Sequence, residues 1–116
     1  MENNIIIHKM NLWNDSFNSI KNKNKTIEMR LNDEKRSKIK IGDIIEFTNT
    51  TTLETMNVKV HNIYKYDDFE QLYRHHDKIS IGYKEDDVAD PNDMLMYYKK
   101  EDIKKYGVLG ISVKVI

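Results

Sequence analysis

Apolar and polar positions alternate in a short segment in the first third of the chain. Residues 25–31 read Lys-Thr-Ile-Glu-Met-Arg-Leu. Because successive side chains of a strand point to opposite faces, this pattern predicts a strand with one apolar and one polar face. The polar face carries Thr26, Glu28 and Arg30, and Lys25 stands at its start. This row of polar side chains makes the segment a candidate functional site.

The same patterns predict the rest of the secondary structure. Helices are predicted from apolar residues at helical spacing, from capping aspartates and from a glycine that ends a helix. The predicted helices cover 11–22, the segment from Asp67 or Asp68 to 76, 92–98 with Pro91 in the first turn, and 101–106 before Gly107. Apolar runs and alternation predict further strands over 5–10, 44–48, 53–66 and 108–116. Residues 32–40 form a polar turn that can hold one helical turn.

The order of these elements predicts an α+β fold. Neighbouring strands joined by short loops favour antiparallel pairing, and several short strands with few helices indicate a curled sheet or small barrel with helices outside it. No βαβαβ rhythm and no glycine-rich phosphate loop is present, which argues against a Rossmann or P-loop fold. The 116 residues contain no linker or repeat, which predicts a single domain over residues 1–116.

Composition excludes several classes of protein. The chain has no cysteine, so disulfides, thiolate zinc sites and cysteine nucleophiles are ruled out. No apolar run approaches the roughly 20 residues of a membrane span, and the N-terminus does not resemble a signal peptide, which predicts a cytoplasmic protein. His75 and His76 are neighbours on a predicted helix, so their side chains diverge and cannot share a metal. We expect no metal and no cofactor.

Charge is unevenly distributed although the net charge is zero. Residues 21–40 contain eight lysines and arginines against three acids. Such a basic segment can bind phosphate, but composition alone favours a solvated lysine-rich loop, because the domain as a whole is not basic. The basic residues that follow the predicted strand are Lys35, Arg36, Lys38 and Lys40. An acidic cluster over 85–93 is a candidate surface for a basic protein partner.

Side-chain chemistry makes the strand at 25–31 the best candidate site. The planar guanidinium of Arg30 suits phosphate or a base edge, and Glu28 can hold Arg30 or accept a hydrogen bond from a ligand. Lys25 can bind phosphate or, if desolvated, act as a base or nucleophile. The alternative is that Glu28 and Arg30 pair with cross-strand neighbours on the surface.

Aromatic residues offer weaker candidates. Trp13 has helical spacing with other apolar residues, and we expect it in the core rather than at a stacking platform. Tyr97 and Tyr98 are adjacent, so one should be buried and the other exposed, where it could stack on a base.

Three segments together resemble the ASCH domain, a family of the PUA-like superfamily. Residues 25–33 read Lys-Thr-Ile-Glu-Met-Arg-Leu-Asn-Asp, 41–47 read Ile-Gly-Asp-Ile-Ile-Glu-Phe, and 106–111 read Tyr-Gly-Val-Leu-Gly-Ile. The first family motif is roughly Gly-x-Lys-x-x-Glu-x-Arg, and Lys23 stands where that motif has glycine. The resemblance spans nearly the whole chain and implies a small PUA-like mixed or antiparallel β-barrel with flanking helices.

The resemblance also implies a cleft lined by Lys25, Glu28 and Arg30 that contacts RNA or a nucleotide-like ligand. A bacterial subgroup of similar size hydrolyses acetylcytidine nucleosides with the motif lysine, a hydroxyl residue three positions later and a distant glutamate. Lys25 corresponds to that lysine, but the position three later is Glu28, and the nearest hydroxyl belongs to Thr26.

Three functions remain open at this point. The first is an RNA- or nucleotide-binding module that uses the residues of the first motif and the basic segment, namely Lys25, Thr26, Glu28, Arg30, Lys35, Arg36, Lys38 and Lys40. The second is a nucleoside amidohydrolase or RNA-cleaving enzyme in which Lys25 and Glu28 are catalytic. The third is a regulatory protein that uses its acidic loop to bind a partner protein.

Overall fold

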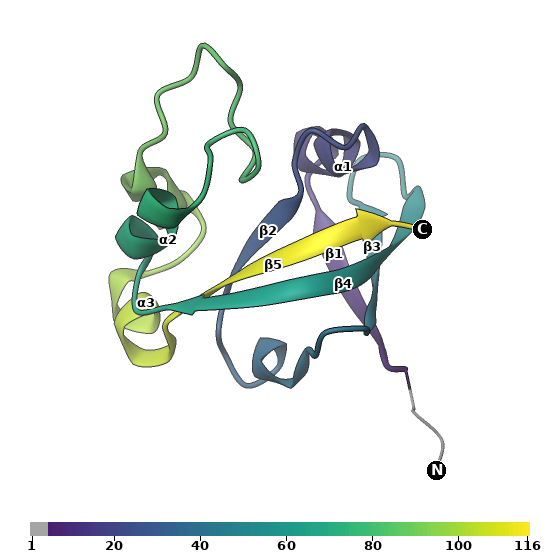
Figure 1. Cartoon of the computed structure of the whole chain (residues 1–116), viewed down its shortest axis with the longest axis horizontal. Coiled ribbons are helices and arrows are strands. Elements are labelled where there is room, and N and C mark those ends of the chain that lie inside the picture. Colours follow the sequence, from purple (N-terminus) through teal and green to yellow (C-terminus); the bar gives the residue numbers. More distant parts are fainter. Residues whose placement is uncertain (1–4) are drawn as a thin grey trace.

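Five strands form one curled, mixed sheet in the computed structural model, which describes residues 5–116 (Figure 1). The strands are β1 (Ile7–Leu12), β2 (Ile27–Leu31), β3 (Ile44–Asn49), β4 (Thr55–Tyr66) and β5 (Val108–Val115). Their order across the sheet is β1-β3-β4-β5-β2, so β1 and β2 are the edge strands. This half-barrel with flanking helices confirms the α+β fold class.

One parallel strand pair makes the sheet mixed, one of the two arrangements that the family resemblance implies. β3 pairs antiparallel with β4, and β5 pairs antiparallel with both β4 and β2, but β1 and β3 run parallel. A parallel pair needs a crossover connection rather than a hairpin. Here α1 (Asn14–Lys21) and β2 supply that crossover, because both lie between β1 and β3 in the chain.

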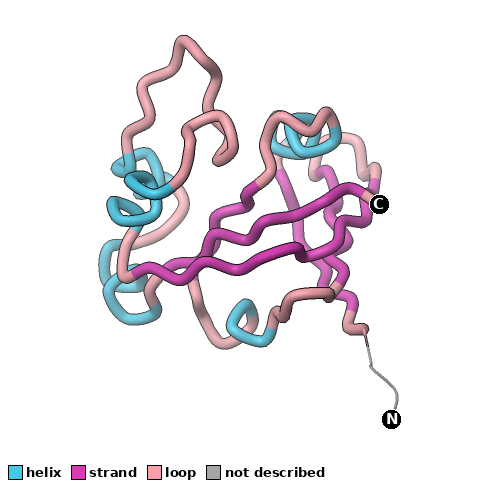
Figure 2. Tube along the Cα trace, viewed as in Figure 1, coloured by secondary structure: helices cyan, strands magenta, loops and turns pink. Residues whose placement is uncertain are grey.

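The helices lie outside the curled sheet (Figure 2). Besides α1 they are α2 (Phe69–His75), α3 (Lys100–Tyr106) and two short 3₁₀ helices, η1 (Arg36–Lys38) and η2 (Pro91–Met96). α1 begins at Asn14, later than predicted, because the two residues at the start of the predicted helix extend β1 instead. Asp68 caps α2 by accepting a hydrogen bond from the Gln71 N–H at 2.9 Å, as its position predicts.

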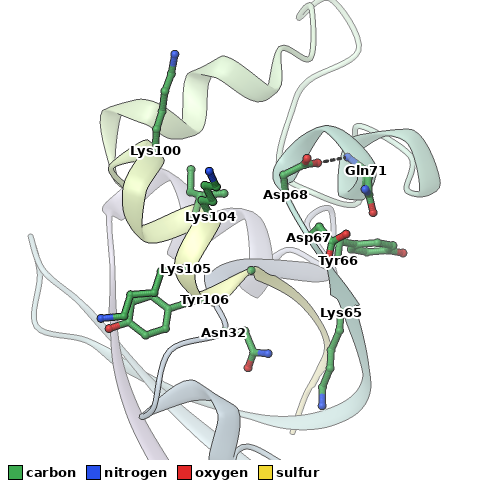
Figure 3. A pocket seen from close by; sticks show the side chains of 12 residues that line it. Asn32, Lys65, Tyr66, Asp67, Asp68, Gln71, Lys100, Lys104, Lys105 and Tyr106 are labelled. Carbon is green, nitrogen blue, oxygen red and sulfur yellow. Dashed lines mark hydrogen bonds between the residues drawn. The ribbon is translucent and has the colours of Figure 1, made fainter.

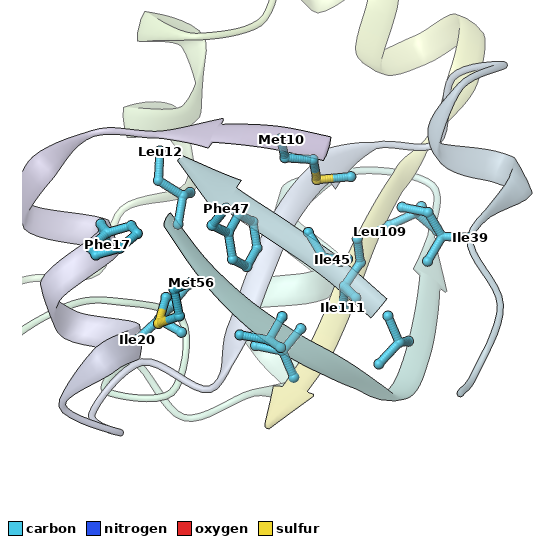
Figure 4. Packing of buried hydrophobic residues seen from close by; sticks show 13 residues of the cluster. Met10, Leu12, Phe17, Ile20, Ile39, Ile45, Phe47, Met56, Leu109 and Ile111 are labelled. Carbon is cyan, nitrogen blue, oxygen red and sulfur yellow. The ribbon is translucent and has the colours of Figure 1, made fainter. Parts of the chain in front are cut away.

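Buried apolar residues form two clusters, of which only the second contains residues of β2. The larger one fills the inside of the curled sheet (Figure 4) and contains Met10, Leu12, Phe17, Ile20, Ile39, Ile45, Phe47, Met56, Val58, Val60, Leu109, Ile111 and Val113. The second packs the apolar face of β2 against α2 and η2, and contains Ile27, Met29, Leu31, Phe69, Leu72, Ile81, Met94 and Val108. The segments that cover β2 therefore come from the second half of the chain.

A buried carboxylate fixes the turn that enters β3. Asp43 Oδ2 accepts hydrogen bonds from the Lys40 N–H at 3.0 Å and from His8 Nε2 at 2.8 Å. Burial acts to raise the pKa of Asp43, but these hydrogen bonds outweigh it and hold that pKa below its ordinary value. The Gly-Asp turn of the second motif thus joins β1 to β3, and it supplies a carboxylate partner for His8 that the sequence did not reveal.

Candidate ligand-binding cavity

Lys25, Glu28 and Arg30 form a buried ion-paired trio. Glu28 and Arg30 are two positions apart in β2 and therefore share one face, and Lys25 reaches over from the start of the strand. The Lys25 Nζ lies 2.8 Å from Glu28 Oε1, and the Arg30 Nη2 lies 2.7 Å from Glu28 Oε2. The side chains are only 8%, 5% and 14% exposed, respectively. Two cations around one carboxylate leave the trio with a net charge of +1.

The two cations keep Glu28 ionised despite its burial. Desolvation acts to raise the pKa of Glu28, but the charges of Lys25 and Arg30, together with their hydrogen bonds, lower it below its ordinary value. In turn, Glu28 raises the pKa of Arg30 against the effect of burial. Glu28 and Arg30 therefore both carry their charges at neutral pH.

Acid is expected to destabilise the fold through Glu28. Because the pKa of Glu28 is lower in the folded than in the unfolded chain, its contribution is complete above its ordinary value of 4.5 and is lost as the pH falls below it. Urea unfolding between about pH 7 and pH 3 measures this loss. Glu28→Gln should show a shallower decline with acid than the wild-type chain, and an equal decline would contradict the assignment.

Arg30 also joins the two edges of the sheet. Its Nη2 donates a hydrogen bond to the backbone carbonyl of Asn11 at 2.7 Å, and its Nε donates to Glu28 at 2.8 Å. Asn11 belongs to β1 and Arg30 to β2, which are the two edge strands and are not paired with each other. The trio therefore lies between the two edge strands of the half-barrel.

A cavity of about 800 Å³, here called the β2 cavity, opens above the trio. Its volume falls in the range of roughly 300–1,000 Å³ that small-molecule sites occupy. The trio lies in its interior, and three exposed side chains line it as well, namely Trp13, Met96 and Tyr97 with exposed fractions of 70%, 80% and 55%. The charged donors of Lys25 and Arg30, beside the exposed aromatic rings of Trp13 and Tyr97, suit a flat ligand with hydrogen-bond acceptors.

Hydrogen-bonded tyrosines hold one wall of the β2 cavity. The Tyr73 and Tyr83 hydroxyls lie 2.8 Å apart, and the Tyr83 hydroxyl also lies 2.7 Å from Asp93 Oδ2, to which it donates. Burial and the hydrogen bonds with Tyr73 and Asp93 raise the pKa of Tyr83, so its phenol stays protonated at neutral pH. This network ties the 83–93 segment to α2 and keeps the wall in place.

Gly82 makes room for the stem of Lys25. Its φ of +111° lies in a region that side-chain-bearing residues rarely adopt, and a Cβ there would stand 3.1 Å from Lys25 Cδ. Gly82→Ala is therefore expected to destabilise the fold by about 1 kcal/mol or more and to displace Lys25. Thermal unfolding measures the first effect. Gly42→Ala is the control for backbone strain alone, because its φ is +94° but no atom lies within 4 Å of its added Cβ.

The comparisons with known proteins place this geometry in a family. The family model of the ASCH domain matches residues 10–116. The chain belongs to the ASCH domain family. This confirms the resemblance of the three motifs and places the protein in a PUA-like family often linked to RNA binding.

Solved ASCH-type structures support the fold over almost the whole chain. The crystal structure of the hypothetical protein PH0355 is 31% identical, with a TM-score of 0.81, and the match covers 96% of this chain and 100% of that one. The solution structure of protein PF0455 from Pyrococcus furiosus is 29% identical, with a TM-score of 0.73, and covers 96% and 98%. No curated protein matches the chain in sequence.

The turn before the first ASCH motif keeps a glycine-like backbone although its glycine is replaced. Lys23 has a φ of +67°, in the left-handed region that favours glycine. The Lys25 N–H in the same turn donates to the Ser19 carbonyl at 3.1 Å. The extra lysine therefore does not prevent the turn from delivering Lys25 to the cavity of this ASCH domain.

The structure brings together only part of the predicted ASCH site. Lys25, Glu28 and Arg30 line the β2 cavity, whereas Thr26 is exposed and lies outside its lining. None of the four basic residues of the following segment lines it either. Arg36 pairs with Asp33 at 2.9 Å, Lys35 and Lys38 line a separate small hollow, and Lys40 is exposed. A binding role for Thr26 and these basic residues stays a prediction.

Trp13 lies at the cavity and not in the core, so the core prediction was wrong. The residue precedes the first turn of α1 with an extended backbone, so it does not share the helical face of the buried Phe17 and Ile20. Of the adjacent tyrosines, Tyr97 is exposed as predicted, while Tyr98 is half-buried and stacks on Phe69 with ring centroids 5.9 Å apart. The sequence signal for Trp13 was its place directly before a helix start.

Neither a cluster of metal-binding side chains nor a helix able to span a membrane is present in residues 5–116. Within this range, no group of three or more histidine, aspartate or glutamate side chains is placed to hold a metal ion. In the same described part of the chain, no helix has the length and apolar character that crossing a bilayer requires.

Proposed function

We propose that this ASCH domain binds one base of a nucleotide or RNA in the β2 cavity. The observation that carries the proposal is the combination of a buried trio of charge +1 with exposed Trp13 and Tyr97 on the lining of one cavity. Purely structural ion pairs need no aromatic rim, and a stacking surface alone needs no buried cations.

The trio has hydrogen-bond donors left for a ligand. Lys25 has three N–H donors, and its ion pair with Glu28 occupies one of them. Arg30 uses Nε and Nη2 for Glu28 and Asn11, and within residues 5–116 its Nη1 has no hydrogen-bond partner. Base carbonyl oxygens and phosphate oxygens are acceptors that suit these donors.

The rim supplies the apolar half of recognition. Trp13 and Tyr97 present ring faces on which a base can stack, an interaction that contributes about 1–3 kcal/mol per base. Stacking accepts any base, so selectivity for a particular base or modification would come from the donors of the trio. This division of roles supports a ligand that is flat at one end and rich in acceptors.

The single tryptophan gives a direct test. Trp13 is the only tryptophan of the chain and lines the cavity, so its fluorescence reports on an occupant. We expect nucleotides, modified nucleosides or short RNA to change this fluorescence, with affinity for the charged ligands falling as salt rises. Calorimetry gives the affinities independently of the fluorophore.

Arg30→Met is the variant that tests the role of the trio. It keeps a long apolar stem but removes the donors, and we expect affinity to fall at least about tenfold. Arg74→Met is the matched control, because Arg74 is exposed on α2 and lies outside the cavity lining. If Arg30→Met bound the ligand as tightly as Arg74→Met or the wild-type chain, the proposal would be overturned.

A hydrolase acting on acetylcytidine is the second candidate, because Lys25 lies in the cavity beside a carboxylate. The hydroxyl of Thr26 does not support it, since Thr26 is exposed outside the cavity lining. Incubation with acetylcytidine separates the two functions. Release of acetate that Lys25→Met abolishes would favour the enzyme, whereas the binding proposal expects the nucleoside to remain intact.

A further inference from the structure

A second hollow, of about 690 Å³, lies where β4 ends and α3 begins. Four lysines line it, and we call it the lysine hollow: Lys65, Lys100, Lys104 and Lys105. Figure 3 shows Lys65 on one side and Lys105 on the other, with Asn32 between them. The two acids in its lining are Asp67 and Asp68, so it carries an excess of positive charge. One of them, Asp68, is engaged in capping α2.

The lysines of the lysine hollow have no acidic partner among residues 5–116, although Lys105 Nζ lies 5.1 Å from the centroid of the Tyr106 ring. Among residues 5–116, none of its four lysines lies within 4.0 Å of a carboxylate oxygen. The Asn32 side-chain oxygen is buried there and has no hydrogen-bond partner in the described part of the chain. Unpaired lysines favour anions such as phosphate, and the unpaired Asn32 oxygen is an acceptor that needs a donor such as a ribose hydroxyl. Both features therefore point to an external ligand.

Two chain segments connect the lysine hollow to the β2 cavity. β2 presents Arg30 to the cavity, and two residues later Asn32 lines the hollow. The segment after η2 also contributes to both, because Tyr98 lines the β2 cavity and Lys100 lines the lysine hollow. Residues two apart along an extended chain are separated by only about 7 Å, so one polymer can occupy both places.

We propose that the lysine hollow is a phosphate-binding site for the backbone of a single RNA strand whose base occupies the β2 cavity. The inference rests on the proposed function and deepens it: the preferred ligand is a strand rather than a free nucleoside. The lysines bind phosphates without reading sequence, and the trio and Trp13 hold the base. The strand then passes from one site to the other along the end of β2.

The test compares a mononucleotide with a short RNA of about eight nucleotides in a calorimetric salt series. The double variant Lys104→Gln/Lys105→Gln removes two phosphate contacts. We expect it to lower RNA affinity roughly tenfold near 0.1 M salt and to reduce the slope of log affinity against log salt by about 1.4. Mononucleotide affinity should not change, because the base cavity stays intact.

Lys59→Gln/Lys114→Gln is the matched control, since these two exposed lysines face each other across β4 and β5 and lie outside both hollows. It removes the same charge and should leave the slope unchanged. Equal effects of the two double variants, or RNA that binds no tighter than the mononucleotide, would contradict phosphate binding in the lysine hollow. Neither result would contradict base binding in the β2 cavity. RNA affinity that depends on Lys104 and Lys105 but not on Arg30 would overturn the proposed base site instead, and with it the two-part site. Binding of neither ligand would overturn both.

Discussion

Replacing Glu28 by glutamine is expected to destabilise the fold by about 3–5 kcal/mol, the range observed when one partner of a buried ion pair is removed. The variant leaves Lys25 and Arg30 buried without the carboxylate that lies 2.8 Å and 2.7 Å from them. Two like charges then face each other away from water. Urea unfolding at neutral pH, monitored by circular dichroism, measures the loss.

Glu54→Gln is the control for that experiment. Glu54 pairs with Lys21 at 2.6 Å, but both side chains are about half exposed, so the same isosteric change should cost less than about 1 kcal/mol. If both glutamine variants lost equally little stability, the trio would behave as a solvated surface cluster, and the argument for a charged cavity interior would fail.

A double variant separates charge balance from packing. Lys25→Met/Glu28→Gln removes one buried cation together with the carboxylate, so it should recover part of the stability that Glu28→Gln loses. Ligand affinity should not recover, because Lys25 donors are absent. From the single to the double variant, stability should therefore rise while ligand affinity does not, which a simple folding defect cannot produce.

The alternating pattern of residues 25–31 predicted the strand and the shared face of Glu28 and Arg30, because side-chain alternation is a local property of extended backbone. It did not predict that this face is buried. Burial arises because β1 and the segments over 73–98 close around β2, and these contacts join residues far apart in the chain. Local patterns carry no information on which distant segment covers a polar face.

The sheet topology shows the same division. The strands could be located from apolar periodicity, but the parallel pairing of β1 with β3 depends on where the crossover through α1 and β2 returns the chain. The β-bulge between Val60 and Asn62 likewise shifts the register of the long β4 against β5. Such an irregularity leaves no periodic signal, although it helps to curl the sheet around its core.

Trp13 illustrates how a local pattern can mislead about a site. Its apolar character and spacing favour a core position, but the start of α1 one residue later places it outside the helix. Exposing the apolar ring of a tryptophan to water is unfavourable for the folded chain. Here the exposed ring lines the cavity that also holds the trio. Its exposure therefore becomes an argument for a ligand that covers it.

Trp13→Ala is accordingly expected to weaken nucleotide or RNA binding by roughly 5- to 150-fold, which corresponds to the loss of about 1–3 kcal/mol of stacking. Stability should change by less than about 0.5 kcal/mol, because the side chain is 70% exposed. Calorimetry replaces fluorescence here, since the variant lacks the fluorophore.

Ile41→Ala is the matched control for Trp13→Ala, because Ile41 is a similarly exposed apolar residue, at 64%, and lies outside the cavity lining. It should leave affinity unchanged. Trp13→Phe should fall between the wild-type chain and Trp13→Ala, since a smaller ring still stacks. If Trp13→Ala bound as tightly as Ile41→Ala, the base would not lie against the rim. The trio would then bind its ligand through charge alone, and the affinity of both variants would decline with salt to the same degree.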